Sequence, residues 1–327
     1  MLVGDEQPIL SQSLLKQLMS NHKKVMVLLA SRNGANWIRE QLDSILAQQG
    51  VGVSILVQDD KSTDDTASII AQYADTAPER ISIILNETGT GSAGANFRKL
   101  IARTDLSAFD YVALADQDDI WDHDKLARGI AAMRRTGAHG YSAAVNAFWP
   151  GGKESVLAQS SRQRSLDFIF EGAGQGCTFI LPVAGFEVIQ EFCRQHAAEL
   201  AEFHFHDWLI YILVRAAGGF WYFDPEPVMR YRQHENNDIG ARGGLASLRR
   251  RVAMVKQGWY GKQVALAMNI FRLAGGMDAR ADALQVTLQA PFSWKRRVSL
   301  ARISGTHGRR RLADRGALIL FALLGWL

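Results

Sequence analysis

The chain contains few cysteines: only two of its 327 residues. Cys177 and Cys193 are too few for the disulfide framework of a small secreted domain, and Cys193 lies in a pattern of helical spacing, so two buried free thiols are expected. A secretory signal is absent as well. Residues 1–22 have acidic residues near their start and no continuous apolar core, which favours an N-terminal amphipathic extension. We therefore expect a cytoplasmic protein.

Long apolar runs are also missing. The last run, residues 317–327, has 11 residues, whereas a membrane-spanning helix needs about 20. Charge is unevenly distributed, with 21 Lys and Arg against 30 Asp and Glu in residues 1–238, and 16 against 3 in residues 239–327. Basic clusters beside exposed apolar side chains are typical of attachment to anionic lipid. Residues 238–327 are therefore predicted to be a basic, amphipathic helical region on the inner face of the cytoplasmic membrane.

Two other interpretations of this basic region stay open. A helical unit could bury the terminal apolar run in its own core and leave a solvated basic face. A nucleic-acid surface is the other, but no zinc-finger spacing or other nucleic-acid module accompanies the basic clusters, and we expect no nucleic-acid partner.

The first half of the chain alternates between apolar segments and segments of helical spacing. Apolar segments lie at residues 25–30, 53–58, 81–85 and 111–115. Continuously apolar strands separated by helices predict an α/β fold with a mostly parallel central sheet covered on both faces. Such sheets bind ligands beyond the carboxyl ends of their strands. The middle region is less regular. Residues 176–182 are predicted to form a strand, and residues 219–234 a strand, a Pro-bounded turn and a second strand.

A glycine motif offers one functional interpretation. Residues 89–94, GTGSAG, fit the dinucleotide-binding pattern, which would indicate a nicotinamide-dependent oxidoreductase. However, the glycines begin several residues after the strand, Glu87 would repel a pyrophosphate, and the first strand lacks the motif. We interpret this segment as a flexible loop that lets the backbone approach a ligand.

A cluster of aspartates follows the strand at residues 111–115. Asp122 and Asp124 lead into the next helix and favour its positive end. Asp116 and Asp118 precede that helix, and the EF-hand pattern does not fit the segment. An Asp-x-Asp pair at a strand end suits Mg²⁺ or Mn²⁺ with substrate phosphates in the remaining positions. The sequence thus predicts a metal and diphosphate site.

Five segments, in order and in rough spacing, resemble the family-2 glycosyltransferases, and most of all their rhamnosyltransferase branch. They are VMVLLASRNGANWIREQLDSILAQ, ILVQDDKSTDDT, LADQDDIWDHDKL, FHDW and YRQHENN, and they cover about residues 25–237. The resemblance implies a single A-type glycosyltransferase domain, residues 23–237, that binds a nucleoside diphosphate sugar. It implies metal-dependent, inverting transfer of one sugar. The expected sugar is rhamnose, with dTDP-rhamnose as its donor, and a UDP-sugar is the alternative donor. The basic region adds the expectation of a polysaccharide or lipid-linked glycan acceptor.

The resemblance also implies roles for single residues. Asp60 would accept the ring N–H of a pyrimidine, Asp116 would reach the ribose or the metal, and Asp118 would ligate the ion, with Asp119 as a supporting or capping group. Asp207 would be the catalytic base. His234 would complete the metal site, and Arg232 could clamp phosphate.

The first motif departs from the family. Ser31, Arg32 and Asn33 are expected to contact the nucleotide, but many relatives have Tyr where this chain has Arg32, so an aromatic wall against the base is absent. The Arg32 guanidinium could stack there or contact phosphate. Lys61 stands where the family commonly has Gly. A non-catalytic sugar-nucleotide or nucleic-acid binding module remains the second alternative to an enzyme.

Overall fold

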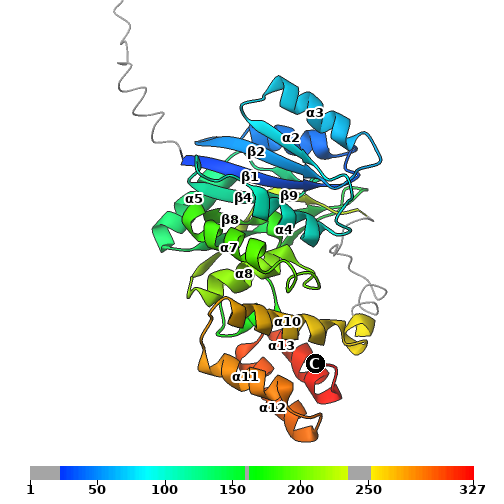
Figure 1. Ribbon diagram of the computed structural model, residues 1–327, viewed down its shortest axis with the longest axis vertical. Helices are drawn as coiled ribbons and strands as arrows, with labels where there is room; N and C mark the ends of the chain where they lie inside the picture. Colours follow the sequence, from blue (N-terminus) through cyan, green and yellow to red (C-terminus); the bar gives the residue numbers. More distant parts are fainter. Residues whose placement is uncertain (1–22, 159–161, 235–251) are drawn as a thin grey trace, which may run out of the picture.

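The computed structural model describes residues 23–158, 162–234 and 252–327. Its centre is a nine-stranded sheet in the order β3-β2-β1-β4-β8-β6-β9-β5, with β7 paired to β6 (Figure 1). The predicted extension over residues 1–22 and the predicted boundary at residue 237 lie outside the described residues. The strands are β1 (Lys23–Ser31), β2 (Val51–Asp59), β3 (Ile81–Leu85), β4 (Tyr111–Ala115), β5 (Ile120–Trp121), β6 (Gly140–Phe148), β7 (Glu154–Leu157), β8 (Ile180–Pro182) and β9 (Trp221–Arg232).

The four strands predicted from the first half of the chain form the parallel part of the sheet. β1 pairs in parallel with β2 and with β4, and β2 pairs in parallel with β3. Ser31 is in register with Asp59, and Leu29 is in register with Ala115. The polar residues that follow β1, β2 and β4 therefore meet at one edge of the sheet, as the α/β prediction requires.

The second half of the sheet corrects two predictions of detail. The expected strand–turn–strand at residues 219–234 is one strand, β9, whose register against β6 shifts between Ala143 and Asn146. Proline lacks the N–H that a regular ladder uses, so these shifts accommodate Pro225 and Pro227. The expected strand at residues 176–182 is a short 3₁₀ turn, η1 (Gly176–Thr178), followed by the three-residue β8.

Alternating side chains of the central strands fill two cores, one on each face of the sheet. Val25, Val27 and Leu29 of β1 belong to one core, and Leu28 belongs to the other. The first core lies under α2 (Ile38–Leu46), α3 (Thr66–Thr76) and α5 (Lys125–Thr136). The second lies under α4 (Ala93–Arg103), α6 (Asp167–Phe170), α7 (Val183–Gln195) and α8 (His206–Ala216). Cys177 and Cys193 are buried free thiols, as predicted.

The C-terminal region is helical, as predicted, and its first helix packs on the second core. Tyr260 and Phe271 of α10 (Trp259–Leu273) belong to the same cluster as Phe168 and Trp208. Figure 1 shows the remaining helices, α11 (Ala279–Gln289), α12 (Trp294–His307) and α13 (Leu312–Leu324), beyond α10. In the part of the chain that the structure describes, no helix has both the length and the apolar character needed to cross a membrane.

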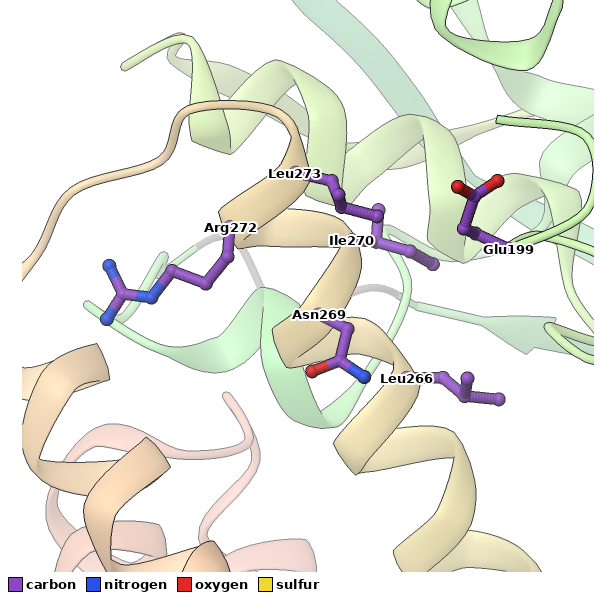
Figure 2. A pocket seen from close by; sticks show the side chains of 6 residues that line it. All are labelled: Glu199, Leu266, Asn269, Ile270, Arg272 and Leu273. Atoms are coloured by element: carbon purple, nitrogen blue, oxygen red, sulfur yellow. The ribbon is translucent and has the colours of Figure 1, made fainter. Parts of the chain in front are cut away.

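A hollow of about 520 Å³ lies between α10 and the segment that carries Glu199. Figure 2 shows Ile270 and Leu273 of α10 pointing toward the element that carries Glu199, whereas Arg272 points away. None of the residues predicted to act on substrate lines this hollow, whose walls are Glu199, Leu266, Asn269, Ile270, Arg272 and Leu273.

Candidate active site

The Asp-x-Asp segment lies in the turn between β4 and β5, and a strand distant in sequence completes it. β5 pairs with β9, with Ile120 opposite Arg230, which carries the end of β9 toward the turn. The Nε2 atom of His234 lies 2.5 Å from Oδ2 of Asp118. The His234 ring stacks on Trp37 with 4.2 Å between ring centroids. The structure thus brings together the two residues, 116 positions apart, that were predicted to share a metal site.

A second group of ligand atoms lies beside this pair. Carboxylate oxygens of Asp116 and Asp119 and the Sγ atom of Cys177 lie within 4.8 Å of one another. Burial, reinforced by the charges of Asp118 and Asp116, raises the pKa of the Asp119 carboxyl well above its ordinary value. Burial also raises the pKa of the Cys177 thiol. A neutral thiol is a poor ligand for a hard ion, whereas clustered carboxylates are good ones.

This donor set fits a divalent cation. Asp119 is fully buried, and its Oδ2 atom has no hydrogen-bond partner among the described residues. Such a buried carboxylate is costly unless a cation or a proton compensates it. The residues that would hold such an ion are Asp116, Asp118 and His234, with Asp119 beside them. Asp119 does not cap α5, because the N-cap position of that helix is Asp124.

Lys125 is a component of the site that the sequence did not reveal. Its ammonium is buried, donates to the carbonyl oxygen of Cys177 at 2.7 Å, and lies 3.0 Å from the centroid of the Trp121 ring. Burial lowers the pKa of this ammonium to about 7. Lys125 therefore ties the first turn of α5 to the η1 turn that carries Cys177. No sequence signal separates it from the surface lysines of other helices.

Arg232 lies at the site, but its guanidinium contacts protein groups. Its Nε atom donates to the carbonyl oxygen of Asp118 at 2.9 Å, and its guanidinium pairs with Glu40. Its backbone N–H donates to Asp119 at 3.2 Å. In this structure Arg232 therefore holds the Asp118–Asp119 turn in place.

The predicted base-recognition residue, Asp60, is enclosed by the glycine loop. Oδ1 of Asp60 accepts from the backbone N–H of Thr90 at 2.7 Å and from the Asn86 amide at 3.2 Å, and Oδ2 accepts from the Thr90 hydroxyl at 2.8 Å. Gly89 and Gly91, on either side of Thr90, have φ of 68° and 86°. These left-handed conformations favour glycine. The glycines of residues 89–94 thus fold the loop over Asp60.

The first motif is also fixed by backbone contacts. The Ser31 hydroxyl donates to Asp59 at 3.0 Å. The Gln117 amide accepts from the N–H of Arg32 at 2.7 Å and donates to its carbonyl oxygen at 2.9 Å. Asn33 adopts φ of 50°, and its side-chain oxygen accepts from the N–H of Thr63 at 2.8 Å. Arg32 itself is exposed, so its side chain is available to solvent or ligand.

Asp207 lies in the first turn of α8, which begins one residue earlier. Phe205 occupies the N-cap position of this helix. A Cβ at Gly176 would lie 3.2 Å from the Asp207 Cβ, so the missing side chain at Gly176 lets Asp207 approach the η1 turn. Asp207 thus contacts the turn whose next residue, Cys177, belongs to the group formed with Asp116 and Asp119. Burial raises the pKa of the Asp207 carboxyl to about 6.

Comparisons with known proteins identify the family. The family model of glycosyl transferase family 2 matches residues 26–182. The dTDP-rhamnosyl transferase RfbG of Shigella flexneri is 34% identical over 90% of this chain and 99% of its own length. The chain belongs to glycosyltransferase family 2.

Other relatives of this glycosyltransferase match over less of their length. The UDP-Glc:alpha-D-GlcNAc-diphosphoundecaprenol beta-1,3-glucosyltransferase WfgD of Escherichia coli is 31% identical over 33% of this chain and 40% of its own. Among solved structures, S. aureus TarS (residues 1–349) in complex with UDP-GlcNAc has a TM-score of 0.56 at 14% identity. That likeness covers 93% of this chain and 90% of TarS, and it shows that both share the A-type glycosyltransferase fold.

Proposed function

We propose that this glycosyltransferase moves rhamnose from dTDP-rhamnose to a hydroxyl of a cell-surface polysaccharide or lipid-linked glycan, with inversion and with Mg²⁺ or Mn²⁺. The observation that carries the proposal is the Asp118–His234 pair beside the Asp116 and Asp119 carboxylates, at the edge of the sheet where Asp60 follows β2. The relative RfbG, named for dTDP-rhamnosyl transfer, supports the choice of donor. The name of WfgD, which contains a diphosphoundecaprenol-linked sugar, supports a lipid-linked acceptor.

The proposed reaction needs one proton acceptor and no protein nucleophile. Asp207 takes the proton of the acceptor hydroxyl while that oxygen forms a bond to the anomeric carbon. The bond from this carbon to the diphosphate breaks on the opposite face, which inverts the anomeric configuration. A bound divalent ion supplies neutralisation of the charge that develops on the leaving diphosphate.

Asp60 supports a pyrimidine nucleotide. Oδ2 of Asp60 accepts one hydrogen bond, from the Thr90 hydroxyl, and a carboxylate oxygen can accept a second hydrogen bond. The ring N3–H of thymine or uracil is a suitable donor. Thr90 and Asn86 keep the carboxylate oriented by donating to it.

Calorimetric titration of dTDP into the purified protein tests the donor site. We expect binding with Mn²⁺, weaker binding by at least about tenfold with chelator, and no binding of NADH, because charge-neutralising contacts to the diphosphate are lost without the ion. Asp118→Ala should bind dTDP as weakly with Mn²⁺ as the wild type does with chelator. Asp122→Ala, which changes an exposed aspartate of the same segment, is the matched control and should bind like the wild type.

The outcomes of this titration separate the candidates. Metal-dependent binding of UDP in preference to dTDP would remove dTDP-rhamnose as donor and leave the transferase assignment standing. Metal-independent binding of NADH would contradict the assignment of the glycine loop, and equal binding by Asp118→Ala would contradict the metal site.

The raised pKa of Asp207 predicts the pH dependence of transfer. A carboxylic acid cannot accept the acceptor proton, so kcat/KM should rise with pH through a midpoint near pH 6, the pKa of the half-buried Asp207 carboxyl, and level off above it. The measurement is kcat/KM for the acceptor between pH 4.5 and 8, with dTDP affinity over the same range as the control. A midpoint near 4 with unchanged dTDP affinity would contradict the role of burial.

A further inference from the structure

The C-terminal helices α12 and α13 form an antiparallel hairpin with one buried side and one outer side. Leu300 and Ser304 of α12 and Leu318 and Ala322 of α13 are buried. Between the helices, the Arg297 guanidinium donates to the carbonyl oxygen of Leu323 at 3.2 Å. The opposite side of each helix therefore faces away from the protein core. Figure 1 shows this hairpin at the end of the molecule opposite α3.

The outer side carries large apolar side chains in rows. Leu312, Leu320 and Leu324 of α13 are 75%, 53% and 43% exposed; the first two are eight residues apart and the last two are four apart, so all three lie on the same half of the helix. Trp294 and Val298 of α12 are 65% and 44% exposed and are also four residues apart. We call these five side chains the outer face. Burying exposed apolar surface of this kind against a partner is favourable.

Basic residues border the outer face. Lys295 and Arg302 of α12 are exposed. From Trp294 to the end of the chain the sole acidic residue is Asp314, which is half-buried. By contrast, two other arginines of the basic region face inward: the Arg309 guanidinium donates to the carbonyl oxygen of Phe170, and Arg310 is buried. Fewer basic side chains are therefore exposed in this region than the sequence suggests.

We propose that the outer face of the α12–α13 hairpin docks on an anionic lipid bilayer, with its apolar rows in the acyl boundary and Lys295 and Arg302 among the lipid phosphates. Exposed Leu and Trp side chains flanked by cations complement a surface that is apolar below and negative above. A second copy of the chain is disfavoured as the occupant, because pairing two such faces would bring like charges together. This proposal is independent of the donor and of the reaction.

Co-sedimentation with vesicles tests the docking surface. The full chain should bind vesicles of phosphatidylglycerol and phosphatidylcholine and bind pure phosphatidylcholine vesicles at least about fivefold more weakly, since each cation near an anionic surface contributes about that factor. The triple variant Leu312→Ser, Leu320→Ser, Leu324→Ser should lose at least about tenfold in affinity for the anionic vesicles. The pair Lys295→Glu and Arg302→Glu should lose a similar factor, and this loss should shrink at high salt.

Matched controls remove the same chemistry elsewhere. The double variant Leu85→Ser, Val188→Ser changes two apolar side chains that are 61% and 63% exposed on β3 and α7. This variant should bind vesicles like the wild type. Thermal melting of every variant checks folding. Absence of binding to anionic vesicles, or equal binding by the triple variant, would overturn the proposal. So would a concentration-dependent dimer in analytical ultracentrifugation that the triple variant dissociates, because the face would then hold a second copy.

Discussion

Replacing Asp207 with Asn should lower kcat by about 10²–10⁴-fold, the range that a positioned general base contributes. The amide keeps the size of the carboxylate but cannot accept the acceptor proton while the new C–O bond forms. Binding of dTDP with Mn²⁺ should stay unchanged, because Asp207 lies on α8, outside the proposed metal ligands. The measurement is dTDP release in the presence of acceptor, together with calorimetric binding of dTDP to the variant.

Controls for Asp207→Asn separate catalysis from folding. Removing an ionisable group that burial already disfavours should not lower the melting temperature, since the raised pKa of Asp207 shows that its charge is costly. Asp105→Asn, which changes an exposed aspartate, should leave both kcat and dTDP affinity unaltered. Turnover by Asp207→Asn at the wild-type rate would remove this residue from the mechanism, and loss of dTDP binding would place it in the donor site.

The parallel half of the fold could be predicted because its information is local. Each of β1, β2, β3 and β4 is a mostly apolar run, and the helices between them fix the crossovers of a parallel sheet. The Asp-x-Asp pair was likewise visible, because clustered carboxylates at a strand end need a cation. Its partner His234 could not be predicted from the chemistry of the residues alone. A lone histidine 116 residues away came only from the family resemblance, and the pairing of β5 with β9 is what places it.

The unpredicted parts of the site depend on tertiary packing. Lys125 and Cys177 follow no motif, and their burial results from η1 turning back against α5. The two prolines of β9 looked like a turn because proline usually ends a regular strand. Irregular pairing with β6 keeps that segment in the sheet. No pattern within the segment itself could reveal this, because the irregularity is a property of the pair.

The exposure of the charged residues in the basic region also could not be predicted from the sequence alone. A run of arginines at residues 309–311 predicts a solvated or lipid-facing surface. Instead the Arg310 side chain is 4% exposed and lies 3.2 Å from Oδ2 of Asp167, a carboxylate that also pairs with Arg215 of α8 at 2.8 Å. The same guanidinium donates to the carbonyl oxygen of Gly172 at 2.7 Å. The link between α12 and α13 is therefore joined to the loop that leads to Gly176, next to Asp207.

Replacing Arg310 with Met should destabilise the protein by about 3–5 kcal/mol, the usual effect of removing one partner of a buried ion pair. Asp167 would keep Arg215, but Glu171, whose pKa burial already raises, would lose the cation 3.5 Å away. Urea unfolding measures the change, and Arg302→Met, at an exposed position, should stay within about 0.5 kcal/mol of the wild type. Adding Glu171→Gln should restore part of the loss, because it removes the uncompensated charge. If the single variant were as stable as the wild type, the C-terminal helices would not be held to the catalytic half through this ion pair.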